Sequence, residues 1–311
     1  MVELEATAIV VTYNSRGHIL AALTALRQAR LSVRLVDNGS TDGTVELVRA
    51  HFPEITVLVG QGNVGFAAAV NRGARGVQSN VLLLINPDCV VPPETARALV
   101  ETVLDRPEIG IAGPRLLDAD GRVAVSAHPF ETLTTVVASR FGGVLVPVPV
   151  RRWLAGQRRR QAYDVCLHGA LPAPVDWVSG ACLAVRTSLF TAVGGLDEAY
   201  FMYYEDEELC LQARRHGADV VYLPQVTAVH SGGASSSDPA WIWPHLYRSM
   251  FVFFGRHRPR SRRAVRAVVL LRAVLGVALA TVRLSLQPRA GIARIRAWTR
   301  VGRIAITRIH V

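Results

Sequence analysis

Four short apolar runs alternate with helix-like segments near the start of the chain, and this alternation restricts the possible folds more than any other feature. The runs occupy residues 6–13, 32–38, 55–60 and 81–86, and helical patterns open near Arg16, Thr41 and Gly65. Alternating strands and helices predict a mostly parallel sheet. The run VLLLIN is typical of a strand buried on both faces. We therefore expect a Rossmann-like α/β fold, with a mostly parallel central sheet and helices on both faces.

The expected strands end in polar residues, and these ends are where an open α/β sheet binds its ligands. They read TYN at residues 12–14, DNGS at residues 37–40 and NPD at residues 86–88. Asp37 lies among good turn and N-cap residues, so turn chemistry explains it as well as nucleotide binding does. Asp88 either shares a divalent metal with diphosphate oxygens or forms an Asx turn before a helix expected near Pro92.

The segment GNVGFAAAVNRG at residues 62–73 opens the third expected helix. Gly65 falls at the helix start, and the small residues behind it let a ligand approach the backbone amides. The spacing is not the G-x-G-x-x-G fingerprint, so the glycines alone are a weak signal. Asn71 fits a ligand site and a helix surface equally well.

The stretch FMYYEDEELC at residues 201–210 sets four consecutive acids behind four large side chains. The helix dipole favours acids in a first turn, which explains at least two of them. It does not explain the preceding apolar residues. Such a collar desolvates a neighbouring carboxylate and raises its pKa, as a general base requires. Asp206 is therefore the candidate base, and Glu205, Glu207 and Glu208 are structural or substrate-orienting.

The remainder of the first 240 residues is less regular. Residues 117–174 lose the strand and helix pattern and predict a long mobile insertion over the site. A helix from about Glu205 to His216, ended by Gly217, and a strand at residues 219–224 follow. His230 comes after that strand. A lone histidine is more often structural, and its place at a strand end also allows a metal or phosphate role.

Positive charge is concentrated in the C-terminal tail. The formal net charge is +11, no acid follows Asp238, and 15 of the 35 basic residues lie beyond it. The other 20 basic residues are outnumbered by 24 acids. One aromatic residue follows Phe254, so the tail lacks the interleaved aromatics that stack on nucleic-acid bases. An anionic membrane surface is therefore the expected partner, rather than nucleic acid.

The tail contains an apolar stretch, residues 264–286, that carries Arg266, Arg272 and Arg283. Three arginines disfavour a spanning helix and suit a helix that lies in the membrane interface. Helical spacing would gather three further arginines on one face: Arg296, Arg300 and Arg303. We expect a catalytic domain at residues 1–240 and an Arg-rich helical, membrane-associating tail at residues 241–311.

The cysteines indicate a reducing compartment. Cys89, Cys166, Cys182 and Cys210 lie in apolar contexts without C-x-x-C spacing, which predicts buried free thiols rather than disulfides or metal ligands. The N-terminal residues lack the basic region and long apolar run of a signal peptide. We expect a cytoplasmic protein that is peripheral on the inner face of the cell membrane.

Seven motifs occur in order between Thr7 and Ser237, and together they carry a family resemblance. They are VVTYNS, VDNGSTDGT, GNVGFAAAVNRG, LINPD, WVSGACLAVR, GGLDEAYFMYYEDEELC and VHSGG. The ordered set resembles inverting family 2 glycosyltransferases, which have a GT-A fold. Within that family it resembles the bacterial rhamnosyltransferase branch that contains the N-acetylglucosaminyl-diphospho-decaprenol L-rhamnosyltransferases.

The resemblance implies a role for each matching residue. Asp37 would face a pyrimidine base, and Asp206 would be the catalytic base. The implied sites are, for the nucleotide sugar, Thr12, Tyr13, Asn14, Asp37, Gly65, Phe66, Asn71 and Asn86; for the sugar and acceptor, Trp177, Ser179, Gly180 and Glu205; and for Mg²⁺ or Mn²⁺, Asp88 and His230. Two positions depart from the family pattern: Glu208 replaces a frequent aspartate, and the metal motif is Asn-Pro-Asp rather than a pair of acids.

The implied reaction is a single displacement with inversion, from a dTDP- or UDP-sugar to a polyprenyl-diphosphate-linked saccharide. Within this branch the leading hypothesis is transfer of L-rhamnose from dTDP-rhamnose to N-acetylglucosamine on the lipid, in cell-wall or polysaccharide assembly. Transfer of galactofuranose or N-acetylglucosamine is an alternative enzymatic hypothesis. A non-catalytic nucleotide- or nucleic-acid-binding protein is the alternative from another class. A pyrimidine nucleotidyltransferase is disfavoured because no Arg/Lys-rich glycine loop opens the chain.

Overall fold

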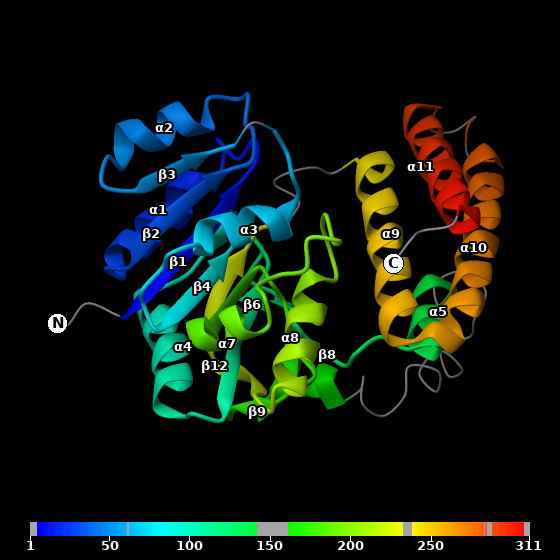
Figure 1. Cartoon of the computed structure of the whole chain (residues 1–311). Coiled ribbons are helices and arrows are strands. Elements are labelled where there is room, and N and C mark those ends of the chain that lie inside the picture. Colours follow the sequence, from blue (N-terminus) through cyan, green and yellow to red (C-terminus); the bar gives the residue numbers. More distant parts are fainter. Residues whose placement is uncertain are drawn as a thin grey trace. The chain divides into compact units, whose positions relative to one another are not determined.

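The structure is a computed structural model of the 311-residue chain, and it describes residues 5–60, 62–141, 161–232, 238–282, 284 and 288–307. The chain forms two compact units (Figure 1). Unit 1 comprises Met1–Phe130, Gln161–Glu198 and Glu205–Ser235. Unit 2 comprises Glu131–Arg160, Ala199–Tyr204 and Ser236–Val311, so two segments from the first 240 residues join the tail. The domain boundary at residue 240 stays a prediction.

Unit 1 is built on a mixed sheet whose first half is parallel. Four consecutive parallel strands form it: β3 (Thr56–Val59), β2 (Ser32–Asp37), β1 (Ala6–Thr12) and β4 (Val81–Ile85). Beyond β4 the order continues with β11 (Cys182–Arg186), β6 (Ile109–Leu117), β12 (Asp219–His230) and β5 (Cys89–Val90). β11 is antiparallel to both of its neighbours, whereas β6 and β12 are parallel. The expected α/β fold with a mostly parallel central sheet is confirmed.

Both faces of this sheet are buried, because alternate strand residues enter two separate cores. In β4, Val81, Leu83 and Ile85 belong to one core, and Leu82 and Leu84 belong to the other. The first core packs against α1 (Ile19–Gln28), α2 (Thr44–His51) and α4 (Pro93–Asp105), and the second packs against α3 (Phe66–Ala74), α7 (Thr187–Ala192) and α8 (Glu205–Arg215). Strands with two buried faces have to be apolar throughout, as the VLLLIN run predicted.

Helix starts follow local chemistry. α1 and α2 begin three residues later than the patterns suggested, at Ile19 and Thr44, because turns precede both helices. Gly65 has a φ of 91°, which glycine adopts without strain, and α3 begins directly after it. α8 ends at Arg215, and Gly217, with a φ of 78°, terminates the turn that follows.

The expectation of an irregular stretch from 117 to 174 is partly wrong. Its described residues form β7 (Val123–Ala124), β8 (Ala127–His128), α5 (Leu133–Phe141) and β9 (Ala173–Pro174). β8 pairs with β10 (Trp177–Val178) in a small separate sheet. Residues 142–160 of this stretch lie outside the described residues. The strand expected at 219–224 is longer than predicted, since β12 continues to His230.

Unit 2 is helical. Its long helices are α9 (Pro239–His257), α10 (Arg262–Val282) and α11 (Pro288–Ile306), joined after α9 by a short 3₁₀ helix, η1 (Pro259–Ser261). Each of the three pairs among α9, α10 and α11 is in contact, and α5 packs against α10. The four cysteines, all in unit 1, are free and buried, as predicted.

Candidate functional site

The carboxyl ends of β1 and β2 are joined by backbone and side-chain hydrogen bonds. The Asn38 amide donates to the Thr12 carbonyl at 2.8 Å, and the Thr41 amide donates to Oδ1 of Asn14 at 2.8 Å. Asp37 is buried, and its carboxylate accepts from the amides of Gly39 and Ser40. The geometry of Asp37 is therefore that of turn chemistry. The contact with a pyrimidine base that the family resemblance implies for Asp37 would be made at the same end of β2.

Asn38, which was not among the predicted site residues, fixes the glycine-containing loop before α3. Its side chain donates to Oδ1 of Asn63 at 2.9 Å and to the Gly65 carbonyl at 3.1 Å, and it accepts from the Val64 amide. It is 4% exposed. These bonds hold Gly65 beside the end of β2. A polar residue directly after a buried strand was the available sequence signal.

Asn71 holds a distant segment of unit 1. Its side chain donates to the Leu196 carbonyl at 2.8 Å and to Glu198, and it accepts from the Leu196 amide at 2.8 Å. A Cβ on Gly195 would lie 2.4 Å from Oδ1 of Asn71, so this approach requires glycine there. Phe66 starts the same helix, and its partly buried ring packs against the second core. The described contacts of Asn71 thus position the GGLDE segment.

Asp88 and His230, which the family resemblance assigns to one metal site, lie next to each other. Nε2 of His230 lies 3.2 Å from Oδ1 of Asp88 and 3.3 Å from Nδ2 of Asn86. The antiparallel pairing of β5 with the end of β12 aligns Cys89 with His230 and brings these side chains together. A carboxylate oxygen and an imidazole nitrogen in one cluster are donors that suit Mn²⁺, and Mg²⁺ needs only one or two carboxylates when substrate phosphates complete its shell. Among the described residues, no group of three His, Cys, Asp or Glu side chains is arranged to hold a metal.

Backbone hydrogen bonds link this cluster to Asp206. The Asn86 amide donates to the Ala181 carbonyl at 2.9 Å. Gly180, the residue before Ala181, donates its amide to Oδ2 of Asp206 at 2.9 Å. A Cβ on Gly180 would lie 3.2 Å from the Cβ of Asp206. The start of β11 therefore places the candidate base beside the end of β4.

Two adjacent carboxyl groups at the start of α8 have perturbed pKa values. Burial raises the pKa of Asp206, against the opposing effect of the Gly180 and Glu207 amides that bond its carboxylate. Burial, and then the neighbouring Asp206, raise the pKa of Glu205 well above its ordinary value. Glu205 is 7% exposed, and its Oε2 is buried without a hydrogen-bond partner among the described residues. Perturbed acids of this kind are typical of functional sites.

The apolar collar before α8 belongs to unit 2. Tyr203 and Tyr204 have φ values of 69° and 72°, a left-handed conformation that is uncommon for bulky residues. The ring of Tyr204 packs against Phe253 of α9, and its hydroxyl donates to Glu131. Backbone strain of this kind persists only where surrounding packing enforces it, and it clusters at functional sites.

The remaining predicted residues lie on the small two-stranded sheet and at its end. The Trp177 indole stacks on His128 at 4.3 Å between ring centres and donates to the Pro129 carbonyl at 3.1 Å. The Ser179 amide donates to the Ser126 carbonyl, and its hydroxyl accepts from Ala181. Ser179 thus lies next to Gly180, whose amide donates to Asp206.

Tyr13 lies apart from this small sheet. It follows Thr12 directly at the end of β1 and is partly exposed.

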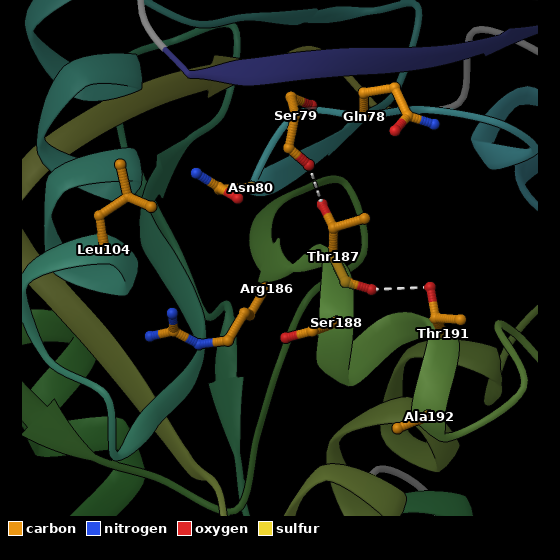
Figure 2. A pocket seen from close by; sticks show the side chains of 9 residues that line it. All are labelled: Gln78, Ser79, Asn80, Leu104, Arg186, Thr187, Ser188, Thr191 and Ala192. Atoms are coloured by element: carbon orange, nitrogen blue, oxygen red, sulfur yellow. Dashed lines mark hydrogen bonds between the residues drawn. The ribbon is translucent and has the colours of Figure 1, made fainter.

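A cavity of about 730 Å³ lies at the other end of β4 and β11, away from this cluster (Figure 2). Its lining residues come from the residues before β4, the ends of α4 and β11, and α7: Gln78, Ser79, Asn80, Leu104, Arg186, Thr187, Ser188, Thr191 and Ala192. Most of its polar groups are bonded to the backbone. Arg186 donates to the carbonyls of Arg106 and Ile109, and Thr187 donates to that of Ser79. The candidate catalytic acids do not line it.

Comparison with known proteins assigns the family. The sequence profile of glycosyl transferase family 2 matches residues 7–145. The chain is 33% identical over 266 residues to the N-acetylglucosaminyl-diphospho-decaprenol L-rhamnosyltransferase of Mycobacterium tuberculosis. The matched region covers 80% of this chain and 84% of that relative. The chain belongs to glycosyltransferase family 2. This family 2 glycosyltransferase is also 27% identical over 228 residues to the low-salt glycan biosynthesis hexosyltransferase Agl10 of Haloferax volcanii, with 72% of this chain and 66% of that relative covered.

Solved structures confirm the GT-A fold of this family 2 glycosyltransferase. The mannosyltransferase PcManGT of Pyrobaculum calidifontis, solved with GDP-Man and Mn²⁺, matches with a TM-score of 0.53 at 17% identity, covering 97% of this chain and 87% of that one. TarS of S. aureus, residues 1–349 with UDP, matches with a TM-score of 0.51 at 14% identity, covering 96% and 90%. The chain is therefore a glycosyltransferase with a GT-A fold, and its relatives include proteins of the rhamnosyltransferase type.

Proposed function

We propose that this family 2 glycosyltransferase moves L-rhamnose from dTDP-rhamnose to N-acetylglucosamine carried on a polyprenyl diphosphate, with inversion at the anomeric carbon. The observation that supports this most is the 33% identity to the mycobacterial N-acetylglucosaminyl-diphospho-decaprenol L-rhamnosyltransferase, which extends over 84% of that relative. Identity over almost the whole relative supports a shared donor and acceptor better than a shared fold does.

In this proposal Asp206 is the general base. It removes the proton from the acceptor hydroxyl, whose oxygen forms a bond to the anomeric carbon as the bond to the nucleoside diphosphate breaks. The raised pKa of Asp206 suits proton acceptance, and the Gly180 amide at 2.9 Å fixes the orientation of its carboxylate. General-base help of this kind contributes about 10²–10⁴-fold to the rate.

The strand ends bind the donor. Thr12, Tyr13 and Asp37 hold the base and ribose, and the loop at Gly65, fixed by Asn38, presents backbone amides to the diphosphate. The remaining roles follow the sequence: Asn14, Phe66, Asn71 and Asn86 border the nucleotide sugar, and Trp177, Ser179, Gly180 and Glu205 border the transferred sugar and the acceptor.

Asp88 and His230 would hold a divalent metal, Mg²⁺ or Mn²⁺. Their donor atoms lie 3.2 Å apart, and this pair fits a cation whose other ligands come from the donor diphosphate and water. When bound, the cation supplies charge stabilisation to the departing diphosphate.

The proposal extends to location. Residues 1–240 act as the catalytic domain, and residues 241–311, with no acid after Asp238, associate with the anionic inner face of the cell membrane, where the lipid acceptor is found. The protein is cytoplasmic and peripheral in this account, and it binds no nucleic acid.

The test is a donor panel. Purified protein with Mg²⁺ or Mn²⁺ is given UDP- and dTDP-sugars and a short polyprenyl-diphosphate N-acetylglucosamine, and the lipid product is weighed by mass spectrometry. A deoxyhexose gain with dTDP-rhamnose alone supports the proposal. A gain with another donor, such as UDP-galactofuranose, keeps the reaction class and replaces the sugar. Absence of both transfer and nucleoside diphosphate release would favour a binding protein.

A further inference from the structure

Helix α10 exposes an apolar face along most of its length. Leu271, Val274 and Val282 are 54%, 59% and 76% exposed. Within α10, which the structure describes in full, the exposed positions after Arg263 are Ala267, Leu270, Leu271, Val274, Ala278, Leu279, Thr281 and Val282, and none is charged. Their spacing of three and four residues places most of them on one side of the helix. A large exposed apolar strip marks an interaction surface.

Two of the three arginines that disfavour a spanning helix, Arg266 and Arg272, contact other helices of unit 2, and Arg283 lies outside the described residues. The Arg266 guanidinium lies 5.2 Å above the ring of Phe251 and donates to the Thr307 carbonyl. The Arg272 guanidinium lies 4.4 Å above the ring of Trp298. Both charges are thus held by neighbouring helices. In the sequence, arginines interrupt an apolar stretch. In the folded helix, Arg266 and Arg272 contact neighbouring helices, and the exposed positions after Arg263 are uncharged.

Helix α11, which packs on α10, carries exposed positive charge. Its exposed arginines are Arg294, Arg296, Arg300 and Arg303, and Arg300 donates to the Ala240 carbonyl. Helices α10 and α11 are in contact, so these charges and the apolar strip belong to the same helical unit. The sequence from Asp238 onward contains no acid to neutralise them.

We propose that the exposed face of α10, together with the positive charge of the adjacent helix α11, docks the chain on an anionic bilayer by inserting into one leaflet. The apolar strip supplies hydrophobic burial, and the arginines attract anionic headgroups. A second copy of the chain would bring the same positive charges together, and nucleic acid offers nothing to an aliphatic strip. The inference rests on the proposed function, which supplies a lipid-linked acceptor.

Close packing distinguishes this docking from a membrane span. Among the described residues, Pro259–Val282 is the one helical segment long and apolar enough to cross a bilayer, with a mean hydropathy of 2.1 over its most apolar stretch. Gly276, however, lies against Trp298, where a Cβ would be 2.4 Å from the indole nitrogen. One side of α10 is therefore sealed against α11, which leaves the opposite side for lipid.

The test is flotation of the full-length protein with vesicles of phosphatidylcholine containing an anionic lipid. The double variant Leu271→Asp, Val274→Asp should lose about a hundredfold in partitioning, because two apolar side chains no longer enter the leaflet. The matched control is Leu171→Asp in unit 1, whose side chain is 77% exposed, and it should float as wild type does. Unchanged flotation of the double variant, or an equal loss in the control, would overturn the assignment.

A second variant tests the charge. Replacing Arg294, Arg296 and Arg303 by Ala should lower binding to anionic vesicles about a hundredfold, at roughly fivefold per arginine. The control removes the same charge from exposed positions of unit 1: Arg49→Ala, Arg75→Ala and Arg106→Ala. Equal losses in the two triple variants would contradict a role for α11. Wild-type protein that resists extraction by alkaline carbonate would contradict docking in one leaflet and indicate a span.

Catalysis separates the two proposals. With a water-soluble short-chain acceptor, the Leu271→Asp, Val274→Asp variant should retain wild-type turnover while losing flotation. If wild-type protein floats but transfers no sugar from any donor, the proposed function fails and the docking surface stands. If transfer is normal and wild-type protein does not float, the docking surface fails alone.

Discussion

The two ends of strands β4 and β11 differ in how their polar groups are used. At one end, Asp206 and Glu205 are acids whose pKa values are raised by burial, and Asp88 meets His230. At the other end, beside the cavity of about 730 Å³, Arg186 and Thr187 bond backbone carbonyls. The cavity is thus lined by side chains that bond the backbone, whereas the acids with perturbed pKa values, a feature typical of functional sites, lie at the opposite ends of the strands.

A large effect on turnover is expected at the metal cluster. Asp88→Asn should reduce turnover by about 10²–10³-fold, since it removes a charge that would hold a cation at the leaving diphosphate. Steady-state transfer with and without EDTA measures this, and EDTA should abolish wild-type activity. Asp105→Asn, at an exposed position ending α4, is the control. Wild-type activity that survives EDTA would exclude the metal role.

The second prediction concerns the pH dependence of turnover. Asp206 has to be ionised to accept a proton, and burial raises its pKa above the ordinary 3.8. Below that raised pKa the rate should fall by about tenfold per pH unit. A pH–rate profile with saturating substrates measures this acidic limb, the pH range over which the rate falls. A limb at or below the ordinary aspartate value would contradict the assignment of Asp206.

The third prediction moves to the other end of the strands. Arg186→Ala should lower the free energy of unfolding by about 1–3 kcal/mol, because the carbonyls after α4 lose their donor. Turnover of the folded variant should be unchanged. Denaturant unfolding and a transfer assay measure the two quantities, with the exposed Ser188→Ala as control. A loss of turnover without loss of stability would make this end functional and break the comparison.

The smallest effect is expected from Glu205→Gln on stability. The folded pKa of Glu205 is raised above its ordinary 4.5, so between these two values the folded state binds more protons than the unfolded state. Wild-type stability should therefore fall as pH rises above about 4.5, by at most about 1.4 kcal/mol per pH unit. Glu205→Gln should flatten that slope, as thermal unfolding at several pH values would show. Parallel curves for the two proteins would contradict a raised pKa.

Local pattern predicted the parts of this molecule that depend on burial along one strand. The four parallel strands and their polar ends are readable because two buried faces demand continuous apolar runs. The family resemblance, rather than local pattern, assigned Asp88 and His230 to one metal site; the structure places them 3.2 Å apart, and the metal itself stays a prediction. The buried free cysteines were predicted from their apolar contexts.

Long-range contacts could not be read from pattern. Asn71 bonds Leu196, 125 residues away, and no local periodicity reports such a partner. The placement of β11 between β4 and β6 is a property of the topology, and it creates the bond between Gly180 and Asp206. The two short strands β7 and β8 and the helix α5, all within residues 117–141, were missed because short elements carry little periodic signal.

The central claim is that Asp206 is the base in sugar transfer, and one comparison tests it most directly. Transfer from dTDP-rhamnose to the short lipid acceptor is measured for wild type and Asp206→Asn, with donor binding measured by calorimetry on the same samples. The account predicts a loss of turnover of about 10²–10⁴-fold with donor affinity nearly unchanged. Turnover near that of wild type in Asp206→Asn would contradict it.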